Sequence, residues 1–161
     1  MMKTLIMYYS KSGNTETVAK TLSNELSTDL IKIEDNKKRD GLFSMSRSVK
    51  DALREAKTKI SPEKLDLDDY DLIYIGTPVW AGKPTPAIIT AIDTYDFKGK
   101  NVILFATMKK SGDEKTIAKM KEKIQVQGAK VINSFAIKVP NQNGNGIKDY
   151  TIGIIKNLSL K

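Results

Sequence analysis

The chain alternates apolar runs of strand length with segments of helical period, and this alternation limits the folds it can adopt. The apolar runs lie at residues 4–9, 29–34, 71–76, 101–107 and 129–138. Three of them, at 4–9, 71–76 and 101–107, are almost continuously apolar, which is typical of parallel strands covered on both faces. The pattern therefore predicts five strands in one parallel sheet.

Helical periodicity follows each run. It predicts helices over residues 15–26, 42–57 and 87–92, a fourth helix that ends at Gly128, and a fifth after the turn at 141–146. Apolar positions mark the last two helices: Ile117, Met120 and Ile124 in the fourth, and Ile147, Tyr150, Ile154 and Leu158 in the fifth. Ser61-Pro62 breaks the chain before the third strand. With right-handed crossovers, the expected fold class is α/β, a three-layer α/β/α sandwich.

We expect a single domain over residues 1–161, because no repeat or linker divides the chain. No apolar run approaches the roughly 20 residues that a membrane helix needs. The first ten residues lack the apolar core of a secretory signal, so a cytoplasmic location is expected.

The chain has no cysteine and no histidine. This composition excludes disulfides, thiolate metal sites, cysteine nucleophiles and histidine general bases. We expect neither a catalytic side chain nor a metal site, and any chemistry must come from a bound cofactor.

The formal net charge is +8, with 27 basic and 19 acidic residues. Scattered lysines serve solubility, but such a charge also attracts acidic partners, nucleic acid or a membrane surface. Nucleic acid is disfavoured, since no run of five basic residues occurs and the aromatic residues are not interleaved with the lysines.

In an open parallel sheet, ligands bind beyond the carboxyl ends of the strands. Three loops should meet there, at residues 10–15, 77–83 and 107–113. The first, Ser-Lys-Ser-Gly-Asn-Thr, leads into a helix whose first N–H groups attract anions. It contains neither a Walker A lysine nor a dinucleotide fingerprint, which favours a monophosphate. The alternative is a helix capped by Ser12 or Asn14 with nothing bound.

The second and third loops suggest a flat guest. Trp80 can offer an aromatic face to a planar ring, or it can simply cover the end of the core. Lys109 and Lys110 can stabilise negative charge on a bound redox ring, or they can be ordinary solvated lysines. A phosphate loop, a tryptophan and a glycine-containing third loop together describe a phosphorylated planar ring.

These features resemble the flavodoxins and flavodoxin-like FMN proteins over essentially the whole chain. The SKSGNT loop matches the family's phosphate-loop pattern, and GTPVWAGKPTP follows the third strand. The resemblance implies the short-chain form, strand order 2-1-3-4-5 and non-covalent FMN. It implies phosphate contacts at Ser10, Ser12, Gly13, Asn14 and Thr15, and ring contacts at Pro78, Val79, Trp80, Ala81 and Gly82. The full set of expected cofactor-binding residues adds Lys11 and Thr77 to these, and Thr107, Met108, Lys109, Lys110, Ser111 and Gly112 from the third loop.

The expected function is an FMN-binding redox protein that passes electrons to a protein partner, for which the basic charge favours an acidic protein. Two alternatives remain open. One is an FMN-dependent NAD(P)H:quinone-type oxidoreductase, and the other is a flavin-free α/β regulatory or binding module.

Overall fold

The computed structural model describes residues 2–36, 58–139 and 144–158. Its main sheet contains β1 (Thr4–Tyr8), β2 (Asp29–Lys32), β5 (Leu72–Pro78), β6 (Asn101–Met108) and β7 (Lys130–Lys138). The strand order is β2-β1-β5-β6-β7, and every neighbouring pair is parallel. This order is the predicted 2-1-3-4-5, so the expected fold is confirmed.

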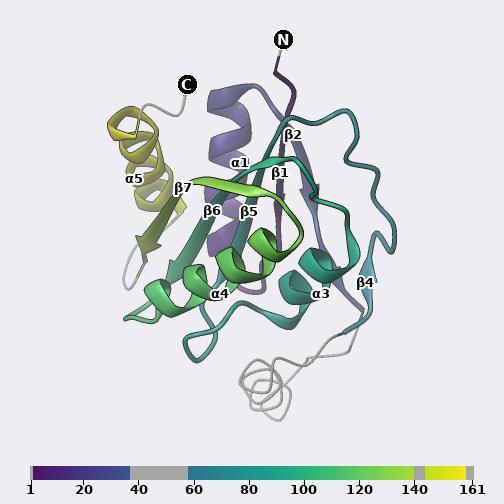
Figure 1. The fold of residues 1–161 in the computed structure, drawn as a ribbon. Helices are drawn as coiled ribbons and strands as arrows, with labels where there is room; N and C mark the ends of the chain where they lie inside the picture. The colour runs from purple at the N-terminus through teal and green to yellow at the C-terminus, as the bar shows by residue number, and fades with distance from the viewer. Residues whose placement is uncertain (1, 37–57, 140–143, 159–161) are drawn as a thin grey trace.

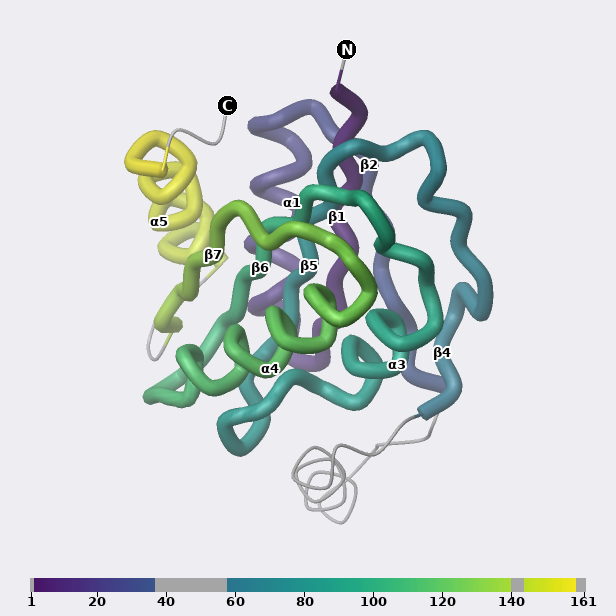
Figure 2. Tube along the Cα trace, in the orientation of Figure 1, coloured from purple at the N-terminus to yellow at the C-terminus, as the bar shows by residue number. Residues whose placement is uncertain are grey.

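Helices cover both faces of the sheet (Figures 1 and 2). Helices α1 (Asn14–Leu26) and α5 (Gly144–Asn157) lie on one face, and α3 (Pro86–Thr94) and α4 (Asp113–Val126) lie on the other. Side chains alternate between these layers along β1, because successive residues of a strand point to opposite faces. Leu5 and Met7 pack on the α3 and α4 side, whereas Ile6 and Tyr8 pack on the α1 and α5 side.

The centre of the sheet is closely packed where β5 meets β6. Gly76 pairs with Phe105, and the Phe105 ring occupies the space that a Cβ at Gly76 would need. The same ring stacks on Phe135 of β7, with centroids 5.4 Å apart and planes 7° apart. The glycine thus makes room for an aromatic layer beneath the carboxyl edge of the sheet.

The second strand is shorter than the predicted 29–34. Strand β2 ends at Lys32 because β1, its only neighbour in the main sheet, ends at Tyr8. The chain then forms β3 (Glu34–Asp35), which pairs antiparallel with β4 (Ile60–Ser61) in a separate two-stranded sheet. The predicted helix over 42–57 lies outside the described residues.

The apolar stripe expected on the last helix is partly wrong. Ile147 is buried, but Tyr150 and Leu158 are 51% and 38% exposed. The helix buries Thr151 and Ile155 instead. Thr151 is compatible with burial because its hydroxyl donates to the Ile147 carbonyl oxygen at 2.8 Å. The helix also begins at Gly144, inside the predicted turn at 141–146.

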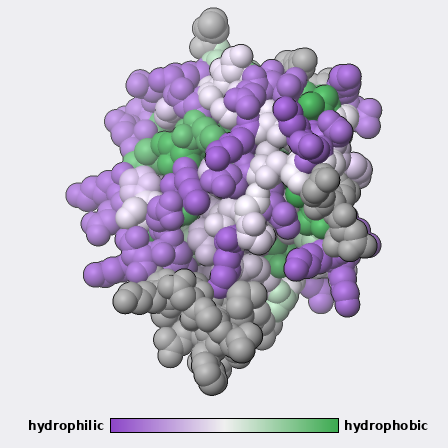
Figure 3. All heavy atoms as spheres, turned by 180° about the vertical axis from the view of Figure 1, so that it is seen from behind, coloured by the Kyte–Doolittle hydropathy of each residue, from purple (hydrophilic) through white to green (hydrophobic). Residues whose placement is uncertain are grey.

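From behind, hydrophilic residues cover most of the surface, with smaller hydrophobic patches between them (Figure 3). Among the described residues, no helix has the length and apolar character needed to cross a bilayer.

Candidate functional site

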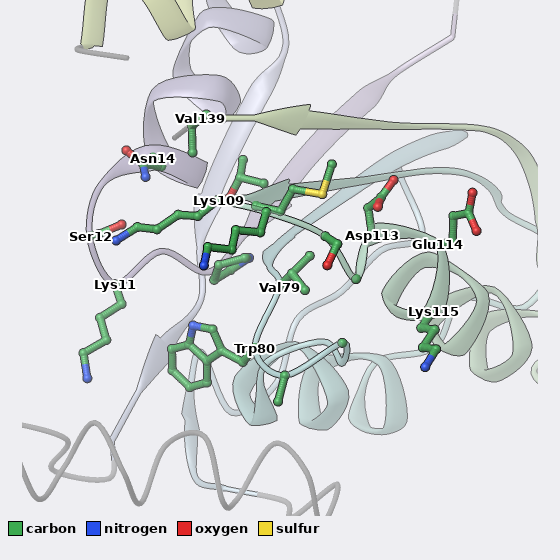
Figure 4. Close-up of a pocket in the computed structure, with 18 residues that line it drawn as sticks. Lys11, Ser12, Asn14, Val79, Trp80, Lys109, Asp113, Glu114, Lys115 and Val139 are labelled. Atoms are coloured by element: carbon green, nitrogen blue, oxygen red, sulfur yellow. The ribbon is translucent and has the colours of Figure 1, made fainter. Parts of the chain in front are cut away.

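An open pocket of about 1310 Å³ lies beyond the carboxyl ends of β1, β5 and β6 (Figure 4). The loops that follow these three strands form its walls, with Val139 after β7. In Figure 4, Lys11, Ser12 and Asn14 lie at one end, Trp80 and Val79 in the middle, and Asp113 and Glu114 at the other end. The three predicted loops therefore meet at one site.

The first loop leaves the start of α1 open. Gly13 occupies the N-cap position in a left-handed conformation, with φ of 98°, and no side-chain hydrogen bond caps the helix. The capped-helix alternative, with Ser12 or Asn14 as the cap, is therefore wrong. Ser10 instead supports the loop from within, since its Oγ accepts the Gly13 N–H at 3.1 Å. The first N–H groups of α1 remain available to an anion at the pocket end.

The second loop contains a tight turn that supports Trp80. The backbone N–H groups of Trp80 and Lys83 each donate to the other residue's carbonyl oxygen at 3.0 Å. Ala81 and Gly82 between them have φ of 51° and 74°, a left-handed pair typical of a type I′ turn. This turn does not use the N–H groups of Ala81 and Gly82, so they can bind the edge of a ligand.

Two neighbours fix the position of the Trp80 ring. The Tyr9 ring packs against it edge-on, with centroids 5.8 Å apart and planes 88° apart. The Lys11 ammonium lies over the indole, 5.9 Å from its centroid. Trp80 packs against the core at its partly buried side while it also lines the pocket. The interpretation that Trp80 covers the end of the core is therefore confirmed, and contact of its indole with a bound ring stays a prediction.

The third loop approaches the second very closely. Gly112 is the N-cap of α4, with φ of 102° and no side-chain cap. A Cβ at Gly112 would lie 2.9 Å from Val79 Cγ1 and 3.0 Å from Gly82 Cα. Only glycine therefore permits both the backbone conformation and this contact.

Two hydrogen bonds of buried threonines hold the loops in place beneath the pocket. The hydroxyl oxygens of Thr15 and Thr107 lie 2.8 Å apart, which joins the start of α1 to the end of β6. Thr77 Oγ1 accepts the Thr85 N–H at 3.1 Å and so closes the base of the second loop. These threonines are buried and order the loops; Thr107 also lines the pocket, whereas Thr15, Thr77 and Thr85 do not.

Most of the predicted site residues are brought together. Fourteen of the eighteen line the pocket: Lys11, Ser12, Asn14, Pro78, Val79, Trp80, Ala81, Gly82, Thr107, Met108, Lys109, Lys110, Ser111 and Gly112. The other four, Ser10, Gly13, Thr15 and Thr77, lie in or beneath the same loops and shape them.

The pocket is also lined by Asp113, Glu114, Lys115 and Val139, which were not among the predicted site residues. The first three form the start of α4, directly after Gly112. Val139 follows the last strand, where its N–H donates to the Met108 carbonyl oxygen at 2.8 Å. The rule that ligands bind at the carboxyl ends of strands could have identified Val139, because it applies to β7 as it does to β6.

A partly buried hydrogen bond joins β1 to the first turn of α1, next to the first loop. Tyr8 donates a hydrogen bond to Glu16 Oε1 at 2.9 Å. This hydrogen bond is the main cause that holds the pKa of Glu16 below its usual value, with smaller contributions from Lys32 and Lys20. Burial and the same hydrogen bond raise the pKa of Tyr8. Glu16 is therefore a fixed negative charge in the first turn of α1, where it complements the helix dipole.

The chemistry of the walls fits a phosphorylated planar ring. Uncapped N–H groups, Ser12 and Asn14 provide donors at one end, and the fixed indole provides an aromatic surface further along. Among the described residues, no group of three or more histidine, cysteine, aspartate or glutamate side chains could hold a metal ion.

Comparison with known proteins agrees with this geometry. The chain is 27% identical over 142 residues to an uncharacterized protein of Methanocaldococcus jannaschii, covering 85% of this chain and 75% of that protein. It is 26% identical over 139 residues to a flavodoxin of Nostoc sp. PCC 7120, covering 81% of this chain and 68% of the other. The crystal structure of a flavoprotein in complex with FMN from Lactobacillus acidophilus NCFM superimposes with a TM-score of 0.69. That protein is 26% identical, and the match covers 84% of this chain and 93% of the other.

The family model described as Flavodoxin matches residues 3–138, which include all three pocket loops and the whole main sheet. This chain belongs to the flavodoxin family.

Proposed function

We propose that this chain binds FMN non-covalently and passes electrons through the flavin to a protein partner. The observation that carries the proposal is the uncapped start of α1 at one end of a pocket that also contains Trp80. A phosphate is the natural ligand of the first feature, and a flat aromatic ring is the natural neighbour of the second. The FMN complex of the Lactobacillus acidophilus flavoprotein supports the same ligand.

The residues of the pocket would divide the binding between them. The N–H groups at the start of α1, with Ser12 and Asn14, would hold the phosphate. Val79, Trp80 and Gly82 would bind the ring, which supplies the electron-accepting and electron-donating group when bound. The close contact between Gly112 and the second loop would keep water from the ring's inner side.

The size of the pocket favours a second candidate function. Its volume of about 1310 Å³ exceeds the roughly 300–1,000 Å³ of common small-ligand sites. Space for a small acceptor beside the ring is what an NAD(P)H:quinone-type oxidoreductase requires. Rapid reduction by NADH or NADPH alone, without an added reductase, would favour this second function over electron transfer to a protein. A cytoplasmic location, expected from the sequence, belongs to the same proposal.

The fluorescence of Trp80 provides the test, because it is the only tryptophan in the chain. FMN and riboflavin are titrated separately into the flavin-free protein, and quenching of the indole emission gives each affinity. Gly13→Ala should weaken FMN binding about tenfold or more, the equivalent of one charge-assisted hydrogen bond, and should change riboflavin binding much less.

Gly99→Ala is the matched control. Gly99 also has a positive φ, 76°, with nothing within 4 Å of an added Cβ, but it lies before β6 at the opposite edge of the sheet. It carries the same kind of backbone strain and should leave both affinities unchanged. Equal losses for FMN and riboflavin in Gly13→Ala would show that the loop is not the phosphate site. A protein that neither quenches nor acquires a flavin spectrum with FMN would be the flavin-free module.

A further inference from the structure

Four lysines line the pocket at its surface: Lys11, Lys109, Lys110 and Lys115. We call them the lysine rim. They come from two loops and the first turn of α4, and all four are exposed. In Figure 4, Lys11 lies beside Trp80, and Lys109 extends from the third loop toward the side on which Ser12 lies. The cations therefore gather around the opening through which a bound ring would be reached.

Most of the lysine rim is not neutralised by neighbouring carboxylates. Within the described part of the chain, no carboxylate lies within ion-pair distance of Lys109, Lys110 or Lys115. Elsewhere, lysines such as Lys32 and Lys123 lie within 4 Å of carboxylates. Asp113 and Glu114 are the acidic residues of the lining, and they lie at the end of the pocket far from Lys11.

One loop at the opposite edge of the sheet is acidic. The loop before β5, residues 62–71, contains five carboxylates and one lysine. It lies at the amino ends of the strands, where the Lys3 N–H donates to Asp71 Oδ2 at 2.9 Å. This loop is therefore acidic, although the same edge carries the exposed Lys98 and Lys130, whereas the lining of the pocket contains four lysines and two carboxylates.

We propose that the lysine rim is a docking surface for the acidic face of a protein redox partner. The proposal rests on the proposed function and specifies its partner. A bound flavin would supply one electron to a one-electron centre of the docked partner, with no atom transferred between the two proteins. Docking at this edge places the partner's centre against the opening of the pocket, which is the shortest route to the ring.

The electrostatics favour an acidic protein over a basic one. Exposed charges around a surface opening steer a partner of opposite sign, and this steering weakens as salt screens it over about 8–10 Å. Rim charges act mainly on the association rate and on the salt dependence of binding. The same lysines would repel a basic partner.

Direct binding tests the proposal with or without flavin. An acidic [2Fe–2S] ferredoxin and the basic protein cytochrome c are titrated into the full chain by calorimetry, with and without excess FMN, at low and at physiological salt. We expect the ferredoxin to bind at low salt, its affinity to fall as salt rises, and cytochrome c not to bind. Lys109→Glu/Lys110→Glu should weaken ferredoxin binding about tenfold or more.

Lys98→Glu/Lys130→Glu is the matched control, because both lysines are exposed at the amino edge of the sheet and the net charge changes equally. This control variant should change the affinity for ferredoxin less than twofold. Equal losses in both variants, or equal binding of the two probes, would overturn the docking surface. Loss of FMN binding with ferredoxin binding retained would overturn the proposed function alone. Duplex DNA that competes with ferredoxin for the rim, and binds more tightly, would identify a different partner and also overturn the proposal.

Discussion

The hydroxyl oxygens of Thr15 and Thr107 lie 2.8 Å apart, although 92 residues separate them in the chain. Both side chains are almost fully buried, at 1% and 3% exposure. The contact joins the first turn of α1 to the last residues of β6, so it holds the first loop against the third loop. It also gives each hydroxyl the partner that a buried polar group needs.

A double-mutant cycle should reveal this coupling. Thr15→Val or Thr107→Val alone leaves one buried hydroxyl without a partner and should lower the free energy of unfolding by about 1–3 kcal/mol. The double variant replaces both hydroxyls with methyl groups. Its loss in the free energy of unfolding should be smaller than the sum of the losses in the two single variants. Urea denaturation measures all four proteins, and strict additivity would mean that the two hydroxyls are not coupled.

Gly76 should not tolerate alanine. The added methyl group would overlap the Phe105 ring, and Phe105 is fully buried. Overpacking of this kind costs about 1–3 kcal/mol or more, so Gly76→Ala should lower the free energy of unfolding by at least that amount. Gly76→Ala/Phe105→Leu should be more stable than Gly76→Ala alone, because the smaller side chain leaves room. Thermal and urea unfolding compare the two, and a double variant that is less stable would contradict the packing argument.

Tyr8→Phe should change stability in a pH-dependent way. The Tyr8 hydroxyl is the main cause of the lowered pKa of Glu16. At a pH above the unfolded-state pKa of Glu16, near 4.5, its lowered pKa in the folded state stabilises the folded protein. This stabilisation is lost as the pH falls through the lowered pKa of the folded state. Tyr8→Phe should therefore cost about 0.5–1.5 kcal/mol at pH 7. The difference in the free energy of unfolding between Tyr8→Phe and the wild type should become smaller at acidic pH.

Urea titrations at several pH values measure that difference, and NMR titration of the Glu16 carboxyl gives its pKa directly. In Tyr8→Phe, the pKa of Glu16 should rise toward its usual value. An unchanged pKa would assign the shift to Lys20 and Lys32, which lie 3.7 and 3.6 Å from the Glu16 carboxylate.

Tyr9 should control the orientation of the indole. Its ring packs edge-on against Trp80 and holds it at the wall of the pocket. Tyr9→Leu should broaden and shift the Trp80 emission and increase its quenching by iodide, since an aromatic pair contributes about 0.5–1.5 kcal/mol beyond area burial. Tyr95→Leu is a control at a buried tyrosine for which no ring contact with Trp80 is found in the described residues. Identical emission in the wild type and in Tyr9→Leu would show that Tyr9 does not hold the indole.

The central strands could be predicted because each is apolar on both faces, whereas their order was predicted from the resemblance to the flavodoxins. The burial of every residue of β5 and β6 except Pro78, Asn101 and Met108 at their ends is what the continuous apolar runs indicated. The edges were less predictable. Nothing in residues 29–34 indicates that β1 will end at Tyr8, and the small β3–β4 sheet depends on a partner that is distant in sequence. On α5, buried Thr151 is a polar residue within an apolar face, so periodicity selected Tyr150 instead.

The site was predictable at the level of loops and less so at the level of atoms. Gly13, Trp80 and Gly112 could be found because loops after parallel strands meet at one edge. The inward orientation of Thr15 could not, because it depends on Thr107 near the end of β6, a strand that is distant in sequence. The same holds for Tyr9, whose contact with Trp80 joins the ends of two neighbouring strands.

The contact of Gly112 with Val79 and Gly82 has a consequence for how such a protein can change in evolution. Because the two loops touch at backbone distance, neither can lengthen or acquire a side chain at this point without displacing the other. Descendants of this chain that replace Gly112 should therefore carry a second change in the tryptophan loop. New ligand specificity at this pocket should arise through paired changes in both loops and not through independent drift in either one.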